Sequence, residues 1–404
     1  MQISEDNEAM FRFIREHIDD DVNKLRLKRC PQAEFDVDFA ITQIECRKRI
    51  RRKLPEIYDD CRFLFPSLLS TEQATCETIA KYHAAIVGEV DCVLDMTAGL
   101  CIDDYYIANV AKHVVSIELN ETIAAVSRYN MSRLRSNIEV VQGNSIDYIT
   151  SECVGRRFDA VFVDPARRAS NQSRVYGLAD CEPDILSLLP ALSRITPILY
   201  VKASPMLDVT QVLRDVLGVT DVWIVSLRNE CKELFFKVDF AGVEPTSDVV
   251  LHCVNFAADE LFEELSLPYS ASRLAVDSFA RSIDGYVYEP NASIMKAGAF
   301  AAVSEKYGVS KIATHSHLFT ANELCKSFPG RVYEVECVLP FKEKSVKSAL
   351  KGVKKMNVSV RNFKLTAEQL KNRLKLSDGG DKYLIGTTTA DGSMVVILCN
   401  RVQV

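Results

Sequence analysis

The chain has 404 residues, 48% of them hydrophobic, and a formal net charge of −6 at pH 7. This length exceeds one ordinary domain and predicts two or three packed units, while the acidic balance excludes a protein that is basic throughout but not one with a local basic surface. No apolar run is long enough to cross a bilayer, and residues 1–6 lack the basic and apolar regions of a secretion signal, which favours a cytoplasmic protein without membrane contact.

Residues 1–88 predict a helical domain. Apolar residues recur at helical spacing in Met10–Ile14 and in Phe39–Ile44, and strand-like alternation is absent. Cap-type residues in Ser70–Thr75 precede a further helical segment at Ile79–His83.

Residues 89–240 change to short β-branched runs separated by longer helical stretches, which is typical of a parallel sheet with helices on both faces. The link before the seventh run is too short for a helical crossover, so the last strand should be antiparallel to its neighbour. We therefore expect an α/β fold with a Rossmann-like seven-stranded sheet. Its strands are predicted near 91–95, 113–118, 138–142, 158–163, 196–202, 220–226 and 234–238.

Gly242–Pro245 has the composition of a linker, and the remaining chain predicts two α+β domains, 241–330 and 331–404. The last domain should close with a hairpin around Asp391–Gly392. Its predicted elements are a strand at 334–339, a helix at 345–355, a strand at 356–361, a capped helix at 366–376, and hairpin strands at 383–386 and 394–398.

Polar or small residues end the first four predicted strands, at 93–99, 114–118, 140–145 and 160–165. The carboxyl ends of parallel strands meet at one crevice, where such sheets bind ligands. A dinucleotide site would need a Gly-x-Gly-x-x-Gly turn to hold a pyrophosphate, whereas this chain has Gly99-Leu100-Cys101. One glycine with an acidic lead residue suits a ligand that carries an amine and a sulfonium better than one that carries phosphates.

These motifs, in this order, resemble the class I S-adenosylmethionine-dependent methyltransferases over residues 70–240. Asp95 to Asp103 also looks like the Asp-x-Thr-Ala-Gly-Leu-Gly-x-Asp turn of certain ribosomal RNA guanine methyltransferases. The resemblance implies S-adenosylmethionine as cofactor. It places Asp95, Ala98, Gly99 and Asp103 at the methionine part, Glu118 at both ribose hydroxyls, Asn144 and Ser145 at the adenine, and adds Thr97 and Leu119 to the cofactor-binding set.

Cys101 stands where the family has its second glycine, and a side chain there should narrow the approach of the backbone to the cofactor. For the acidic residues, the alternative reading is that Asp95 and Glu118 only end strands or cap helices. The ordered set of four motifs favours the cofactor site over that alternative.

Asp164 to Arg168 ends the fourth strand and resembles the Asp-Pro-Pro-Tyr motif of enzymes that methylate exocyclic or amide nitrogen. The resemblance implies that the Asp164 carboxylate and the Pro165 carbonyl accept the two amine hydrogens. Lys202, after the fifth strand, either orients the substrate or pairs with Asp164. The predicted catalytic residues are Asp164, Pro165 and Lys202; the histidines and thirteen cysteines show no metal spacing, and no catalytic metal is expected.

Ala166 and Arg167 replace the second proline and the aromatic of that motif. A guanidinium can stack on a base or hold a phosphate with two hydrogen bonds, so Arg167 and Arg168 could bind substrate. A salt bridge to a loop acid such as Glu182 is an equal alternative.

Residues 341–375 carry eleven basic side chains against Glu343 and Glu368, a local electrostatic footprint of nucleic-acid binding. This stretch resembles a THUMP-like domain over 331–404, and 241–330 is similar to the ferredoxin-like domain found beside such modules. A solvated helix face is the alternative. The predicted substrate-binding residues are Arg167, Arg168, Lys354, Lys355 and Arg361, and a second basic run, Arg47–Lys53, could extend the same track.

Together these patterns favour a methyltransferase that acts on a base nitrogen in structured RNA, either rRNA or tRNA. Two alternatives stay open: a methyltransferase of a protein or small molecule, and a non-catalytic RNA-binding protein. The sequence does not indicate the oligomeric state.

Overall fold

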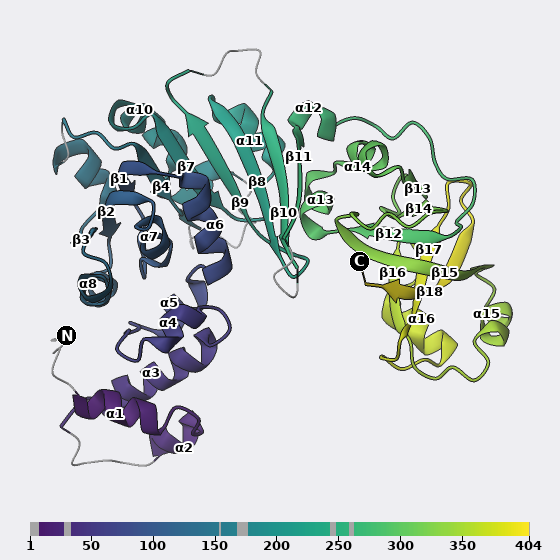
Figure 1. Cartoon of the computed structure of the whole chain (residues 1–404), viewed down its shortest axis with the longest axis horizontal. Coiled ribbons are helices and arrows are strands. Elements are labelled where there is room, and N and C mark those ends of the chain that lie inside the picture. Colours follow the sequence, from purple (N-terminus) through teal and green to yellow (C-terminus); the bar gives the residue numbers. More distant parts are fainter. Residues whose placement is uncertain are drawn as a thin grey trace. The chain divides into compact units, whose positions relative to one another are not determined.

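The computed structural model describes residues 8–27, 34–152, 155–167, 177–242, 248–257 and 262–403. The chain forms two compact units, shown in Figure 1: the first comprises Met1–Thr220 and Phe235–Pro245, and the second Asp221–Leu234 and Thr246–Val404. Of the predicted linker, only Gly242 lies within the described residues. No helix in these ranges is both long and apolar enough to span a membrane.

The first unit begins with short helices, which confirms the predicted helical region. Their apolar faces form one core in which Phe11, Ile14 and Ile41 are buried together with Tyr129 of a later helix. The helices are α1 (Glu8–Glu16), α2 (Val22–Leu27), α3 (Val37–Ile50), α4 (Pro55–Asp59), α5 (Leu68–Gln73) and α6 (Glu77–Val87).

The basic run at 47–53 is partly structural. Arg47 is only 4% exposed, and its guanidinium donates to the backbone carbonyls of Tyr58, Asp60 and Phe63. Lys53 donates to two backbone carbonyls of the α5 region. Both cations donate to backbone carbonyls, so we do not count them as part of a basic track on the surface.

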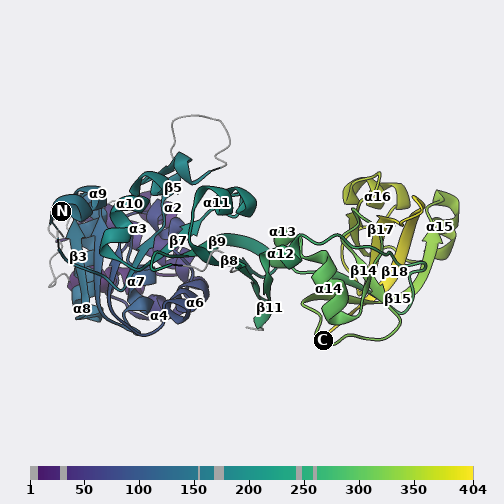
Figure 2. The same ribbon diagram turned by 90° about the horizontal axis from the view of Figure 1, so that it is seen from above.

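The sheet of the first unit has the strand order β9-β7-β4-β1-β2-β3, with β9 contributing Phe235–Asp239. The strands β7, β4, β1, β2 and β3 pair in parallel. Helices α7 and α8 lie on one face and α10 and α11 on the other, as Figure 2 shows. The elements are β1 (Val90–Asp95), α7 (Ile102–Ile107), β2 (Ala111–Glu118), α8 (Glu121–Leu134), β3 (Ile138–Gln142), β4 (Ala160–Val163), α10 (Ile185–Ile195), β7 (Ile198–Ala203), α11 (Val209–Asp215) and β9 (Glu230–Asp239). The predicted fold class is confirmed.

A two-residue turn joins β8 (Val219–Leu227) to β9. Arg228 and Asn229 have φ values of 52° and 63°, so both central residues are left-handed, as in a type I′ hairpin. A hairpin makes its strands antiparallel, as predicted. In the second unit, β10 (Val250–Phe256) adds to β8 in parallel and β11 (Phe262–Pro268) follows antiparallel, two neighbours that the sequence did not predict.

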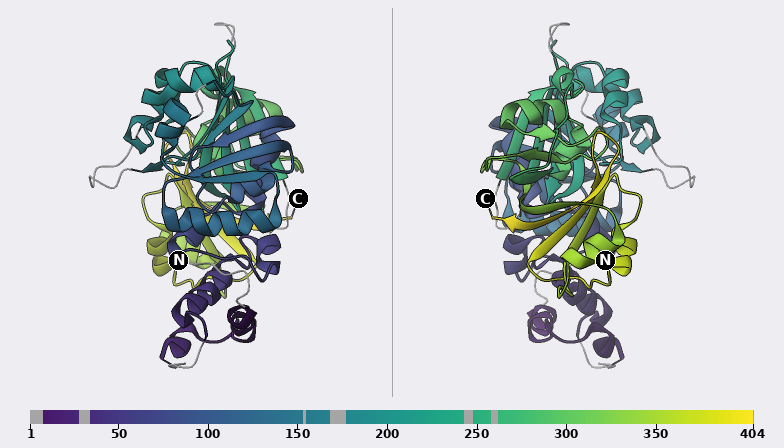
Figure 3. Two further views of the ribbon diagram at one scale, coloured as in Figure 1. Left: turned by 90° about the vertical axis from the view of Figure 1, so that its left-hand side faces the viewer. Right: turned by 90° about the vertical axis from the view of Figure 1, so that its right-hand side faces the viewer.

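The second unit also contains a seven-stranded sheet of order β13-β14-β12-β15-β18-β17-β16. Helices α15 (Glu343–Ala349) and α16 (Ala367–Leu374) pack on one face of it through Val346, Leu370 and Leu384 (Figure 3, right). The remaining elements are α12 (Tyr269–Ser272), β12 (Tyr286–Pro290), α13 (Ala292–Ala297), α14 (Phe300–Tyr307), β13 (Ser310–Lys311), β14 (Phe319–Ala321), β15 (Gly330–Pro340), β16 (Asn357–Arg361), β17 (Lys382–Thr388) and β18 (Met394–Val402).

These elements follow the predicted order for residues 331–404, with one shortened helix. Helix α15 ends at Ala349 and not at residue 355, because the chain turns through Gly352 at φ 90°. The predicted cap of α16 is present: Thr366 Oγ1 accepts from the Gln369 amide, and the Gln369 side chain accepts in return from the Thr366 amide. The four-domain division stays a prediction.

Candidate functional site

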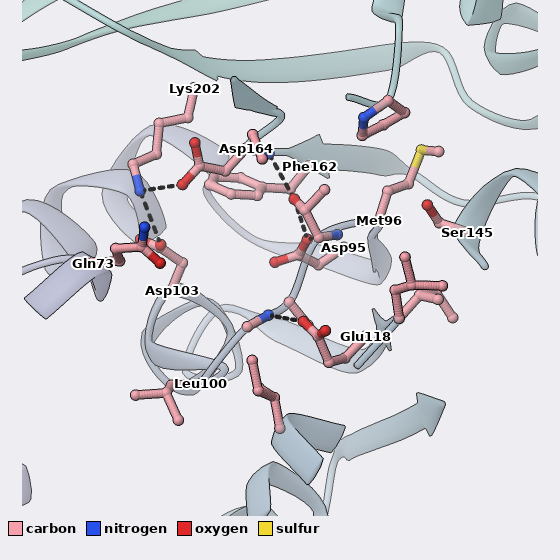
Figure 4. Close-up of a pocket in the computed structure, with 18 of the residues that line it drawn as sticks. Gln73, Asp95, Met96, Leu100, Asp103, Glu118, Ser145, Phe162, Asp164 and Lys202 are labelled. Atoms are coloured by element: carbon pink, nitrogen blue, oxygen red, sulfur yellow. Dashed lines mark hydrogen bonds and ion pairs between the residues drawn. The ribbon is translucent and has the colours of Figure 1, made fainter. Parts of the chain in front are cut away.

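A cavity of about 520 Å³ opens in the first unit at the carboxyl ends of β1, β2, β4 and β7 (Figure 4). Its volume is in the range of small-molecule sites. Asp164 and Lys202 line it, and so do all the residues predicted to bind cofactor: Asp95, Thr97, Ala98, Gly99, Asp103, Glu118, Leu119, Asn144 and Ser145.

Thr97 ties two strand ends together. Asp95 Oδ1 accepts from the Thr97 amide at 2.7 Å and from Thr97 Oγ1 at 3.3 Å. The same hydroxyl oxygen accepts from the Asp164 amide at 2.7 Å. Hydrogen bonds through Thr97 therefore link the end of β1 to the end of β4 beside the cavity.

Glu118 is fixed at the end of β2 by backbone amides. Its Oε2 accepts from the Gly99 amide at 2.9 Å and its Oε1 from the Asn120 amide at 2.6 Å. Gly99 has φ 52°, a conformation that glycine adopts without the cost of a Cβ atom. Each carboxylate oxygen keeps a second lone pair that can accept from a ligand hydroxyl.

Cys101 does not narrow the cavity as the sequence suggested. Its backbone is left-handed, with φ 55°, and its amide donates to the Ala98 carbonyl at 2.7 Å. The side chain is fully buried and is absent from the cavity lining. Burial raises the pKa of the Cys101 thiol well above its ordinary value, so the thiol stays protonated and unreactive.

At the end of the cavity near β3, the lining contains the side-chain amide of Asn144 and the apolar side chains of Leu119 and Ile146. Asn144 caps a short helix, α9 (Ser145–Asp147), because its Oδ1 accepts from the Ile146 amide at 2.8 Å. Leu119 is 66% exposed and lines the cavity together with Ile146. An exposed leucine in a pocket offers a flat ligand an apolar contact.

Lys202 lies between two carboxylates, as Figure 4 shows. Its Nζ donates to Asp164 Oδ2 at 2.6 Å and stands 3.8 Å from Asp103 Oδ2. The side chain of Lys202 is 12% exposed and that of Asp164 is 42% exposed. The structure thus forms the pairing of Lys202 with Asp164, and Asp164 is the member of the pair that faces solvent.

The N-terminal helical region contributes two residues to this cluster, and sequence reasoning missed both. Thr75 Oγ1 donates to Asp103 Oδ2 and accepts from Lys202 Nζ at 2.8 Å. His83, fully buried, contacts Asp103 Oδ1 through Nδ1 at 2.8 Å and stacks on Phe235. Burial alone would raise the pKa of Asp103, but Lys202, His83 and Thr75 lower it to about 2.

Two short paired strands after Asp164 contribute to the cavity lining. Strand β5 (Ala166–Arg167) pairs with β6 (Cys181–Glu182), and Ala166 and Glu182 both line the cavity. Pro165 is buried and is not part of that lining. The side chain of Arg167 and all of Arg168 lie outside the described residues, so their predicted contacts stay predictions.

The basic stretch of the second unit is only partly neutralised. Arg361 pairs with buried Glu289, Lys347 pairs with Glu343, and Lys371 pairs with Glu368 and Asp378. Eight further cations have no ion pair within the ranges that the structure describes: Lys342, Lys344, Lys351, Lys354, Lys355, Lys364, Arg373 and Lys375. In the same ranges, no group of three or more potential metal ligands comes together.

Two family models match the second unit. Residues 286–329 match a ferredoxin-like domain, and residues 330–401 match a THUMP domain-like model. No curated protein is significantly similar to the chain in sequence.

Among solved structures, a putative methyltransferase from Porphyromonas gingivalis W83 is 31% identical, with a TM-score of 0.88 over 98% of each chain. Two partial likenesses are too weak to bear on the fold. A putative O-methyltransferase from Klebsiella pneumoniae is 10% identical over 41% of this chain and 82% of its own, with a TM-score of 0.33. A putative RNA methyltransferase from Pyrococcus horikoshii is 15% identical over 41% and 85%, with a TM-score of 0.29.

Proposed function

Because the chain belongs to the family of the Porphyromonas gingivalis protein, class I methyltransferases with ferredoxin-like and THUMP-like domains at the C-terminus, we propose that it methylates a base nitrogen in structured RNA. The observation that carries the proposal is that three strand-end carboxylates, Asp95, Glu118 and Asp164, line one cavity. This is the arrangement that a cationic cofactor and an amine substrate require. We further propose that the protein acts in the cytoplasm.

S-adenosylmethionine, the cofactor of this family, supplies a methyl group bonded to a sulfonium. The residues present fit it. Asp95 would accept from the amine of its methionine part, and Glu118 would accept from both ribose hydroxyls while its amide contacts hold it in place. Leu119 and Ile146 would pack on the adenine. Since the Asn144 carbonyl caps α9, its amide nitrogen is the group left for the adenine edge.

Methyl transfer needs an aligned nucleophile and removal of its proton, so positioning should dominate. Lys202 donates to Asp164 Oδ2, and we propose that the Asp164 carboxylate accepts an amine hydrogen of the substrate. Because Lys202 donates to Asp164 and Thr75, we assign it to holding that carboxylate and not to taking the proton. Asp103, through Lys202, keeps the pair in place.

A methyl-transfer assay with wild-type protein and labelled S-adenosylmethionine tests the proposed activity. RNA from cells that lack the gene should accept the methyl group, and RNA from cells that express it should accept far less because its site is already modified. Failure to label either RNA, with protein that binds the cofactor, would contradict an RNA substrate.

Lys354 and Lys355 should carry part of the RNA contact, since both are exposed and unpaired among the described residues. Replacing both with alanine should weaken RNA binding and reduce the slope of log K against log salt by about two. Filter binding over a range of salt concentrations measures this slope. Lys371→Ala is the matched control, because Glu368 and Asp378 already neutralise that lysine. An equal loss in both variants would contradict a specific RNA contact.

A protein or small-molecule acceptor is the second candidate function. It is favoured by Ala166, an exposed small residue of the cavity lining at the place where the related motif has its second proline. RNA should inhibit methylation of such a substrate weakly and without marked salt dependence, whereas an RNA enzyme should bind competing RNA with a steep salt dependence.

A further inference from the structure

Asp95 and Asp104 are two neighbouring carboxyl groups in the interior of the first unit. Asp104, in the first turn of α7, is 0% exposed, and Asp95 is 3% exposed. Ser116 of β2 and Cys101 surround them and are also fully buried. Among the residues that the structure describes, both oxygens of Asp104 and the Ser116 hydroxyl lack a hydrogen-bond partner of ordinary geometry.

Two adjoining buried carboxyl groups cannot both stay ionised without a large desolvation and repulsion cost. The nearby basic side chains contact a different carboxylate: Lys202 and His83 both lie against Asp103. Thr97 donates to only one oxygen of Asp95. A proton held by the pair would supply the missing donor, because one carboxyl could then donate to the other.

The titration of these groups agrees with the geometry. Burial, and after it the charge of Asp104, raises the pKa of Asp95 well above its ordinary range. Burial also raises the pKa of Asp104 to about 7. Asp103 faces the pair from the same helix, and Cys101 adds a protonated thiol. Such a pair titrates as one unit.

We propose that Asp104 is a positioning residue that shares a proton with Asp95, and that cofactor binding expels this proton to solvent. The proposal rests on the proposed function, because the amine of the cofactor is the cation that would replace the proton at Asp95. Asp95 lines the cavity and Asp104 does not, so the ligand meets Asp95 directly and Asp104 acts through it. Cofactor affinity should therefore rise with pH while the pair still holds its proton.

Calorimetry with S-adenosylhomocysteine, which carries the same amine, tests the linkage. Titrations at pH 6 to 8 in buffers of different ionisation enthalpy give the number of protons released. Wild-type protein should release protons at pH 6, and its Kd should fall by up to tenfold per pH unit. Asp104→Asn should release fewer protons and show a nearly flat Kd. Asp91→Asn removes an exposed carboxylate from the same strand and should behave as wild type. Equal proton release in wild type and Asp104→Asn would overturn the proposal.

Unfolding without any ligand tests the pair independently. A carboxyl whose pKa is raised by folding contributes stability that is complete below pH about 4 and is lost as the pH rises through about 7. The unfolding temperature of wild type, relative to that of Asp104→Asn, should thus fall between pH 5 and 9, and parallel curves would overturn the proposal.

Infrared spectroscopy of wild type covers the case in which Asp104→Asn does not fold. A neutral, buried carboxylic acid should show its carbonyl band at pH 6 and lose it when ligand is added, and a missing band would overturn the proposal. Absence of ligand binding at every pH would instead overturn the proposed function, while the unfolding curves and the band in ligand-free protein would still decide whether the pair holds a proton.

Discussion

Replacing Asp164 with asparagine should lower the rate of methyl transfer by about a hundredfold to ten-thousandfold, the usual effect of losing a group that accepts a proton. The variant keeps the size of the side chain and removes the anion that would accept the substrate hydrogen. The Asp164 backbone amide still donates to Thr97, so the turn that carries Asp95 should be unchanged. We therefore expect the Kd of the cofactor to change by less than about threefold, or under 0.7 kcal/mol.

Single-turnover methyl transfer and calorimetry measure the two quantities separately. Asp215→Asn is a matched control, because Asp215 is exposed at the end of α11, away from the cavity lining. A rate within tenfold of wild type would exclude Asp164 as the acceptor. Loss of cofactor binding together with the rate would assign Asp164 to the cofactor site.

The strand ends could be predicted from sequence because their signals are local. A β-branched run followed by a polar residue marks the end of each strand, and the parallel order then brings Asp95, Glu118 and Asp164 to one edge of the sheet. The cap at Thr366 and the type I′ turn at Arg228 and Asn229 are equally local. For such features, nearby residues alone determine the geometry.

The partners of buried charges could not be predicted in this way. His83 meets Asp103 across 20 residues, Arg361 meets Glu289 across 72, and neither contact leaves a periodic signal. A count of charges along the chain also cannot distinguish buried Arg47 from its exposed neighbours. Such pairs depend on packing between distant elements, which the pattern of one segment does not contain.

The mostly buried cation at the site leads to the second prediction. Lys202→Met should destabilise the fold by about 3 to 5 kcal/mol at pH 7, the usual cost of removing one partner from a buried ion pair. Asp103 would keep Thr75 and His83 but lose its strongest cation. Urea unfolding at pH 7 measures the change. Lys112→Met is the control, since Lys112 and Asp91 form an exposed pair, and it should leave stability unchanged.

The pH dependence of this loss follows from the pKa of Asp103. In wild type that pKa is about 2, so the carboxylate contributes stability that is present above pH about 4 and is lost as the pH falls through 2. Without Lys202, burial should raise the pKa above its ordinary value, and the carboxyl would then favour the folded state when protonated. The difference between wild type and Lys202→Met should therefore be largest at neutral pH and shrink toward pH 3. A difference that is constant over this range would show that Lys202 stabilises the fold through packing and not through its charge on Asp103.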